Sequence, residues 1–315
     1  MIIWANLDCE ARWGGGSLPQ SVARRVSAVS SLLSALAPAG EPVEIFAPAP
    51  VDPARIRLPD ITLRTGEPAR WDLAWADPNA KTANDRRVAL ALDEQLSTRL
   101  PGARAIDSLA QLDEHLAHGA AAAGVDRRWV CKAPWTAAGR DRAHGQGDTL
   151  DGELRVYVGR LLERFGVVLF EPWLDRVLDI GTCARLSADG TVAAQAPHTL
   201  LSDPRGGFLG IDLALPPISD VDRGSLAAAT DAAGAALHRL GYTGPFTVDA
   251  FVYRSGGGTR LRPLCELNAR HTFGHVARAL AARFGTRVLG FGAPPAGAQV
   301  LVAPAADDPT TAWAA

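Results

Sequence analysis

Long apolar runs and paired cysteines are both missing from this chain, and each absence narrows its class. No run approaches the ~20 apolar residues that a membrane-spanning helix needs. The first residues, Met1–Asp8, carry no basic region and no cleavage site, so we expect a first strand there. The four cysteines lie far apart and form no CxxC pair, which argues against disulfides and a zinc site. We therefore expect a cytoplasmic protein with reduced thiols and no membrane partner.

Lysine and asparagine are also scarce. Of the 32 basic residues only Lys81 and Lys132 are lysine, and asparagine occurs at four positions. A chain that uses arginine for plain positive charge keeps lysine where its own chemistry is needed, so Lys132 is a candidate functional residue. The net charge of −2 implies no bulk attraction to nucleic acid, and we expect small-molecule partners. With 315 residues, 47% of them hydrophobic, the chain can form two or three lobes with sizeable cores.

The first part of the chain has the pattern of a parallel sheet. Apolar runs at Met1–Leu7 and Pro42–Ala47 predict two strands, and Val22–Leu36 has helical periodicity between them. Trp71–Ala76 predicts a third strand. A β-α-β start of this kind indicates an α/β architecture.

Polar residues follow a regular pattern on two later strands, which flank a glycine-rich hairpin at 254–258. Side chains alternate faces along a strand, so Glu266 and Asn268 point the same way, and Asp249 joins them if the strands pair antiparallel. Two carboxylates and an amide oxygen suit Mg²⁺, which keeps waters and takes further ligands from phosphates. Arg270 adds a fixed positive fork beside this site. The pattern alone leaves open a polar strand end with solvated charges.

Four polar features follow one another along the chain. They are Lys132 at the end of a strand, a glycine-rich loop over Thr136–Gly147, a strand that ends in Glu171-Pro172-Trp173-Leu174, and the Asp249…Glu266-x-Asn268-x-Arg270 pair. This ordered set resembles the ATP-grasp superfamily over about two thirds of the chain, residues 80–290. The resemblance implies an α/β (α+β) protein: an N-terminal parallel βαβ pre-ATP-grasp domain followed by a two-subdomain ATP-grasp fold.

The resemblance also implies domain limits. We expect a substrate domain over 1–83 and a helical connector over 84–127, in which Asn84 is the N-cap of a helix over Val88–Leu96. A small subdomain with the phosphate loop covers 128–178, and a large subdomain with the metal site covers 179–302. Residues 303–315 are expected to form a flexible tail.

Individual residues of the phosphate region take roles from the same resemblance. Lys132 matches a strand lysine that contacts nucleotide phosphates, and Arg86 stands where a second phosphate-binding residue is usually lysine. In the loop, Gly139 permits close backbone approach to phosphate, while Arg140 and Arg142 offset its charge.

The hinge between the two subdomains is implied at the strand end. There Glu171 and backbone groups of Trp173 and Leu174 would contact the adenine edge. Asp179 resembles the acid that binds the ribose hydroxyls, with Asp175 as a rival.

The resemblance completes the site with a metal and a reaction. Asp249, Glu266 and Asn268 match ligands of Mg²⁺ or Mn²⁺, and Arg270 matches a position that steadies an acyl-phosphate or carboxylate. The implied enzyme is an ATP-dependent carboxylate–amine ligase that works through an acyl-phosphate and releases ADP and phosphate. Lys132, Arg140 and Arg270 would then be its catalytic, charge-compensating residues. A kinase or phosphotransferase and a non-catalytic nucleotide-binding regulator remain alternatives, and a homodimer is a candidate assembly.

Two other chemistries find no support in the chain. His271 and His275 have an i, i+4 spacing, but no third ligand or HExxH glutamate accompanies them. We expect His275 to pack against its helix and leave His271 as a candidate substrate neighbour. A hydrolase triad needs a Gly-x-Ser-x-Gly elbow, and the sequence contains none.

Overall fold

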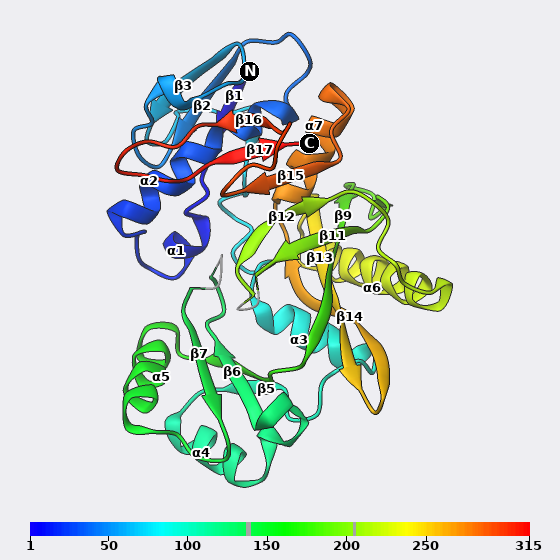
Figure 1. The fold of residues 1–315 in the computed structure, drawn as a ribbon. Helices are drawn as coiled ribbons and strands as arrows, with labels where there is room; N and C mark the ends of the chain where they lie inside the picture. Colours follow the sequence, from blue (N-terminus) through cyan, green and yellow to red (C-terminus); the bar gives the residue numbers. More distant parts are fainter. Residues whose placement is uncertain (137–139, 204–205) are drawn as a thin grey trace.

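A four-stranded parallel sheet forms the N-terminal lobe (Figure 1). The computed structural model describes residues 1–136, 140–203 and 206–315. The sheet has the order β3-β2-β1-β4 and consists of β1 (Ile2–Trp4), β2 (Val43–Ala47), β3 (Ile61–Thr65) and β4 (Leu73–Ala74). Its helices are α1 (Cys9–Trp13), α2 (Gln20–Val29), and the 3₁₀ segments η1 (Ser30–Leu36) and η2 (Pro53–Arg55). The predicted β-α-β start is confirmed.

The predicted helix over Val22–Leu36 changes character in its middle. It begins at Gln20 and continues as a 3₁₀ helix from Ser30. There the Ser30 hydroxyl donates to the Val26 carbonyl at 3.1 Å, and such bonds from serine to the preceding turn compete with regular helix geometry. The third strand is likewise shorter than predicted, since it covers only Leu73–Ala74.

A small antiparallel sheet forms the second lobe, at the bottom of Figure 1. Its order is β5-β8-β6-β7, with β5 (Arg104–Ile106), β6 (Arg128–Lys132), β7 (Arg142–Gln146) and β8 (Val168–Pro172). The helices of the same lobe are α4 (Leu109–Ala117), α5 (Gly152–Phe165), and the 3₁₀ segments η3 (Ala120–Ala123) and η4 (Val125–Arg127). Trp129 and Phe170 are fully buried in its core, where residues of α4 and α5 join them. The predicted connector over 84–127 is therefore wrong in its second half, because β5 and α4 belong to this lobe.

Helix α3 (Arg86–Gln95) makes up the rest of that connector. It packs on the large sheet and on α6 (Asp220–Arg239), and its first residue Arg86 also bonds the Ala133 carbonyl of the small lobe. Its N-cap is Asp85, whose carboxylate accepts the Arg87 amide at 2.9 Å, so the predicted cap Asn84 is wrong. Asn84 instead holds the end of the strand that carries Glu266 and Asn268: its side chain accepts the Ala269 amide at 2.9 Å and donates to the Ala269 carbonyl at 3.1 Å.

A nine-stranded antiparallel sheet is the centre of the molecule. Its order is β14-β13-β9-β11-β12-β15-β17-β16, and β10 pairs with β9. Its strands are β9 (Arg176–Leu186), β10 (Val192–Ala194), β11 (His198–Ser202), β12 (Phe208–Asp212), β13 (Gly244–Ser255), β14 (Gly258–Asn268), β15 (Val288–Phe291), β16 (Gln299–Val302) and β17 (Ala312–Ala314). Helix α6 packs on β9, β13 and β14, whereas α7 (Phe273–Phe284) packs on β9, β12 and η1.

The C-terminal residues belong to this sheet, so the predicted flexible tail is wrong. β17 pairs antiparallel with both β15 and β16, and Ala312 and Ala314 are buried. Gly290 on β15 allows the close pairing, because a Cβ there would lie 2.1 Å from the Trp313 ring. Arg55 of the first lobe adds an ion pair of 2.8 Å with Asp308.

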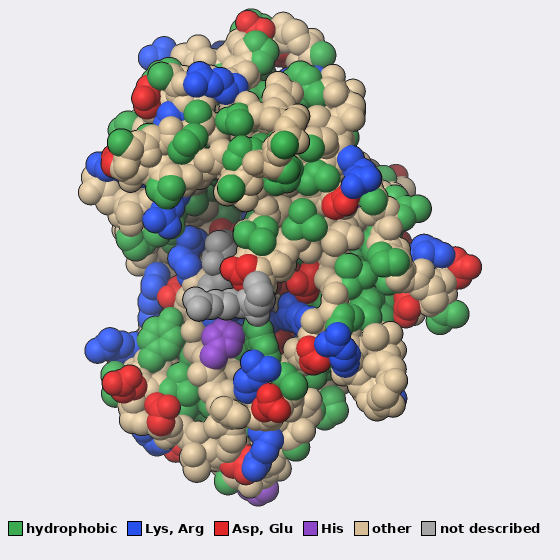
Figure 2. Space-filling model, in the orientation of Figure 1, with side chains coloured by type: hydrophobic (Ala, Val, Ile, Leu, Met, Phe, Trp, Pro, Cys, Tyr) green, Lys and Arg blue, Asp and Glu red, His purple; other side chains and the backbone are tan. Residues whose placement is uncertain are grey.

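One hydrophobic core joins the first lobe to the end of the chain. Ile3 and Leu32 share it with Val276, Leu280 and Leu301. In Figure 1 the N-terminal sheet and strands β15 to β17 accordingly lie together, and the small lobe is separated from them by a waist. Side chains of both charge signs gather around this waist in Figure 2. Among the described residues, no helix has the length and apolar character to cross a bilayer.

Candidate active site

The β13–β14 hairpin brings the predicted metal ligands together. Asp249 pairs directly with Glu266, and Thr247 pairs with Asn268, so the side chains at 249, 266 and 268 share one face. The Asn268 amide donates to the Asp249 carboxylate at 3.0 Å. The result is an oxygen-rich edge with two carboxylates and one amide. Among the described residues, no group of three or more His, Cys, Asp or Glu forms a metal centre of another kind.

The two carboxylates differ in their affinity for a proton. Burial and the neighbouring Glu266 raise the pKa of Asp249 to about 8. Burial also acts on Glu266, but the guanidinium groups of Arg86 and Arg142 outweigh it and lower the pKa of Glu266 to about 2. Near neutral pH Glu266 is therefore ionised, whereas Asp249 holds a proton that an additional cation nearby would displace.

Arg86 lies on this acid. Its guanidinium donates to Glu266 at 2.7 Å, to the Ala133 carbonyl at 2.6 Å and to the Thr136 hydroxyl at 2.8 Å. It thereby ties helix α3 to β14 and to the beginning of the predicted phosphate loop. The phosphate contact that the sequence predicts for Arg86 stays a prediction.

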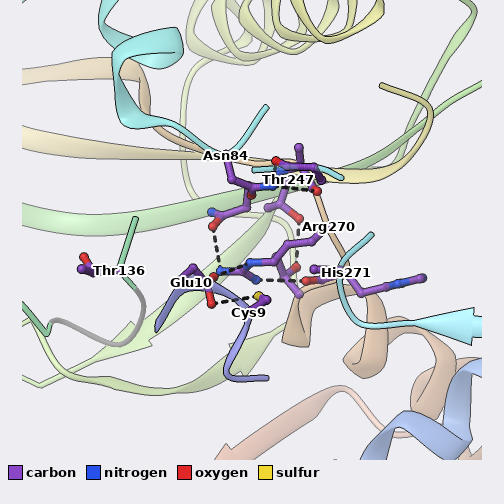
Figure 3. A network of polar contacts seen from close by, with 12 residues as sticks. Cys9, Glu10, Asn84, Thr136, Thr247, Arg270 and His271 are labelled. Carbon is purple, nitrogen blue, oxygen red and sulfur yellow. Dashed lines mark hydrogen bonds and ion pairs between the residues drawn. The ribbon is translucent and has the colours of Figure 1, made fainter. Parts of the chain in front are cut away.

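Arg270 receives a partner from the first lobe. Its Nε lies 2.6 Å from the Glu10 carboxylate, and its Nη2 donates to the Asn268 side-chain oxygen at 2.9 Å. Figure 3 shows Glu10 and Cys9 reaching this arginine from α1, and the Cys9 thiol donates to Glu10 at 3.0 Å. The Trp75 ring lies 5.5 Å from the same guanidinium. Sequence reasoning missed Glu10, because no local pattern indicates that α1 approaches β14.

Lys132 and Glu171, on neighbouring strands of the small sheet, form an ion pair. Both are buried, and the other Glu171 oxygen accepts from Arg262 at 2.8 Å. Arg262 also forms an ion pair of 2.7 Å with Asp93. Burial opposes ionisation of Glu171, but Arg262 and Lys132 hold its pKa well below the usual range. The sequence named Lys132 and Glu171 but missed Arg262 and Asp93.

The predicted hinge lines a cavity of about 500 Å³. Trp173, Leu174, Asp175 and Asp179 all contribute to it. The Trp173 amide already donates to the Arg128 carbonyl at 2.8 Å, and the Trp173 carbonyl accepts from the Val125 amide at 2.8 Å. The ring of Trp173 is thus more available to a ligand than its backbone.

Asp179 and Asp175 differ in their surroundings. Asp175 forms an ion pair of 2.9 Å with Arg254. Asp179 lies 3.3 Å from Arg176 and also lines the neighbouring cavity, which Asp175 does not. That position favours Asp179 over its rival as the acid between the two cavities.

The neighbouring cavity, of about 290 Å³, is lined by the predicted metal ligands and by several other predicted site residues. It is lined by Arg140, Arg142, Asp179, Asp249, Glu266, Asn268 and Arg270, all named from the sequence, together with Glu10 and Arg176, which sequence reasoning missed. Arg142, Arg176 and Asp179 also line the hinge cavity, so the two spaces adjoin. Lys132, Glu171 and Arg86 line neither cavity and stand behind the wall. The predicted Gly139 lies outside the described residues.

The two histidines of the rejected zinc site have structural partners. The His275 ring nitrogen accepts the Thr272 amide at 3.1 Å and closes the N-terminus of α7, in keeping with the packing role expected for it. His271 precedes the helix, and its ring bonds the Ala74 carbonyl at 3.0 Å. Burial lowers the pKa of His271 to about 4 and that of His275 to about 3.

Similarity to known proteins appears only at the level of structure. No protein-family model matches the chain, and no curated protein sequence matches it. The chain is similar to the N5-carboxyaminoimidazole ribonucleotide synthetase of Thermus thermophilus, with 16% identity and a TM-score of 0.56 over 100% of this chain and 94% of that one. It is also similar to the biotin carboxylase domain of the Hydrogenobacter thermophilus 2-oxoglutarate carboxylase, with 12% identity and a TM-score of 0.58 over 99% and 85% of the chains. For the phosphoribosylamine–glycine ligase of Thermotoga maritima the values are 12%, 0.55, 100% and 89%.

These three proteins have ATP-grasp folds, and the likeness extends over nearly all of this chain. The chain therefore has the ATP-grasp fold, and the predicted fold class is confirmed.

Proposed function

We propose that this protein is an ATP- and Mg²⁺-dependent ligase that joins a small carboxylic acid to an amine. The observation that carries the proposal is the clustering of Asp249, Glu266, Asn268 and Arg270 around one cavity of an ATP-grasp fold. The Hydrogenobacter structure, which contains MgADP and a bicarbonate anion, supports a site of this type for a nucleotide and a small acid. The two neighbours that are a synthetase and a ligase support the reaction class.

The adjoining cavities suggest how the nucleotide lies. The hinge cavity, with the Trp173 ring and Leu174, suits the adenine, because both side chains offer apolar surface. Asp179 stands at the passage between the cavities, where its carboxylate can accept from the ribose hydroxyls. The triphosphate then extends into the second cavity, toward Arg140 and Arg142.

Asp249, Glu266 and Asn268 fit a magnesium site, because their donors are hard oxygens on one strand face. When bound there, Mg²⁺ would offset charge on the phosphate oxygens. Arg270 would bind the acceptor carboxylate beside them, held in place by Glu10. These positions bring two anions together, which is the main physical task of phosphoryl transfer to an acid.

The proposed reaction needs no nucleophilic side chain. A carboxylate oxygen attacks the γ-phosphorus, the bond to the β–γ bridging oxygen breaks, and ADP leaves. The amine nitrogen then attacks the carbonyl carbon of the acyl-phosphate, the carbon–oxygen bond to phosphate breaks, and the amine loses a proton. Arg140, Arg142 and Arg270 stabilise charge that develops on phosphate and carboxylate oxygens. Lys132 adds positive potential from behind the wall.

The cellular setting also remains our prediction. All four cysteines are unpaired, as expected for the reducing cytoplasm. The substrates are proposed to be a free small acid and a free amine, with neither nucleic acid nor membrane as partner, and the homodimer stays a prediction.

One observation favours a second candidate, a nucleotide-binding regulator without turnover. Arg86 occupies a carboxylate oxygen of Glu266 that a metal would use, and Arg86 stands where a lysine is usual in the ATP-grasp pattern. In a regulator this ion pair would persist when nucleotide binds. In the ligase, Glu266 would exchange Arg86 for the metal.

The test is ATP turnover against a panel of small acids, with hydroxylamine as the trapping amine. The ligase predicts Mg²⁺-dependent ADP and an equal amount of hydroxamate for some acid in the panel. Glu266→Gln should lower ADP formation by about a hundredfold, because one anionic metal ligand is lost. Glu153→Gln, an exposed acid on α5, is the control and should be silent. ADP without hydroxamate would indicate a phosphotransferase, and Mg²⁺-ATP binding without any ADP would indicate the regulator.

A further inference from the structure

The second cavity has two chemically different walls. One wall carries the charged groups described above. The other is formed by side chains from α2, the segment after β4, β11, β12 and the start of α7, namely Val26, Trp75, Leu200, Phe208, Ile211 and Phe273. These elements come from both the first lobe and the large sheet, so the apolar wall depends on the way the two lobes pack.

Aromatic rings connect this wall to the charged end. The Trp75 ring lies 5.5 Å from the Arg270 guanidinium and 5.2 Å from the Phe273 ring. The Phe208 ring lies 6.2 Å from the Phe273 ring and is nearly parallel to it. A ligand whose carboxylate meets Arg270 would thus place its next atoms on an apolar aromatic surface.

The polar groups next to this wall carry no charge. The hydroxyls of Thr247 and Thr272 bond each other at 2.9 Å. His198 is fully buried, and neither of its ring nitrogens has a hydrogen-bond partner among the described residues. Burial and nearby Arg278 lower the pKa of His198 to about 3, so the imidazole is neutral near pH 7. The apolar side chains of this wall themselves offer no cation to a second anion and no hydrogen-bond partner to a hydroxyl group.

We propose that the acid activated at Arg270 carries a compact apolar group, branched aliphatic or aromatic, which packs against Trp75, Phe208 and Phe273. This inference rests on the proposed ligase function and adds the substrate class to it. It assigns the apolar wall to the acid and not to the amine, because Trp75 contacts the arginine that would hold the carboxylate.

The test uses acids of equal shape and different polarity. Isocaproate is compared with succinamate, and leucine with asparagine, by calorimetric titration into the full-length protein saturated with ADP and Mg²⁺. We expect the apolar member of at least one pair to bind about tenfold more tightly or better, which is the discrimination that apolar pockets reach for small groups. Equal binding within both pairs, tighter binding of the polar members, or no binding of all four acids would overturn the inference.

A matched pair of variants locates the effect. Phe208→Ser removes a ring that is 39% exposed on the apolar wall, and Phe284→Ser removes one that is 40% exposed at the end of α7, outside this cavity. Phe208→Ser should weaken binding of the apolar acid about tenfold and leave the affinities for the polar acid of the same pair and for ADP unchanged. Phe284→Ser should change none of these three affinities. Equal effects of the two variants would overturn the assignment to this wall.

Failure of the inference and failure of the ligase proposal remain distinguishable. ADP formation is measured in parallel with ATP and each of the four acids. Turnover with succinamate or asparagine but not with the apolar acids refutes the apolar substrate class and leaves the ligase intact. Preferential binding of the apolar acids without ADP formation supports the apolar site and counts against the ligase.

Discussion

Arg262 offers the sharpest test of the buried charge network. Its guanidinium is 3% exposed and lies 2.7 Å from Asp93, 2.8 Å from Glu171 and 3.0 Å from the Leu264 carbonyl. Arg262→Met keeps much of the side-chain volume but removes the charge. Glu171 retains Lys132, whereas the Asp93 carboxylate keeps the Thr98 hydroxyl, at 2.7 Å, as its side-chain partner among the described residues. Breaking a buried pair in this way costs about 3–5 kcal/mol.

A second estimate limits that cost. Asp93 can escape by taking up a proton, and protonating an aspartate of ordinary pKa at pH 7 costs about 4 kcal/mol, at about 1.4 kcal/mol per pH unit. The loss should therefore lie near 4 kcal/mol in urea unfolding followed by circular dichroism. Burial already raises the pKa of Asp93 in the folded wild type although Arg262 opposes the shift, and removal of Arg262 would raise that pKa further. The folded variant then binds more protons, and the loss should shrink by about 1.4 kcal/mol for each unit of pH below 7.

Two controls accompany this experiment. Arg260→Met changes an exposed arginine on the same strand and should alter the unfolding free energy by less than about 0.5 kcal/mol. Adding Asp93→Asn to Arg262→Met should recover about 2 kcal/mol, because the stranded charge is gone. A loss below about 1 kcal/mol for Arg262→Met, or a loss that does not depend on pH, would refute the proposed role of the network.

Two further predictions concern single charges. Lys132→Met should weaken Mg²⁺-ATP binding about tenfold in calorimetric titration. The control is Lys81→Met, which changes an exposed lysine over the Trp135 ring and should have little effect. Equal effects of the two variants would remove the case for Lys132. Asp308→Asn should lower the unfolding free energy by about 1–3 kcal/mol at pH 7, and exposed Asp307→Asn should not. Burial opposes the charge of Asp308, but Thr310 and Arg55 hold its pKa below the usual value. The loss of unfolding free energy in Asp308→Asn should therefore fade as the pH drops through that pKa. A loss that does not depend on pH would contradict a role for the ion pair.

The clustering of Asp249, Glu266 and Asn268 could be predicted because it depends on local geometry. Strand alternation fixes Glu266 and Asn268 on one face. The glycine turn at Gly256 and Gly257 sets the register as far as Phe251 opposite Arg262, and a shift of two residues beyond that pair brings Asp249 opposite Glu266 on the same face. Each of these facts is encoded within a segment of about 20 residues, a length over which turn chemistry and period-2 alternation decide the pairing.

The errors came from partners distant in the sequence. β17 is a short strand without clear alternation, and it is ordered by β15 and β16, which supply its hydrogen bonds. β5 is equally short and joins the small sheet through β8, more than sixty residues later. Such strands gain their stability from tertiary pairing, which single-sequence periodicity does not report.

The cavity itself explains why net charge is a poor guide to its ligands. Four arginines line it, Arg140, Arg142, Arg176 and Arg270, and so do four acids, Glu10, Asp179, Asp249 and Glu266. The wall is thus nearly balanced, and it would not attract a triphosphate by excess charge alone. On the proposed function, the surplus comes from the divalent cation and from Arg86, whose partner Glu266 is already counted among the four acids, whereas the charge of Lys132 is balanced by Glu171. A protein of net charge −2 can accordingly hold two anions side by side, because the decisive charges are few, buried and fixed in place.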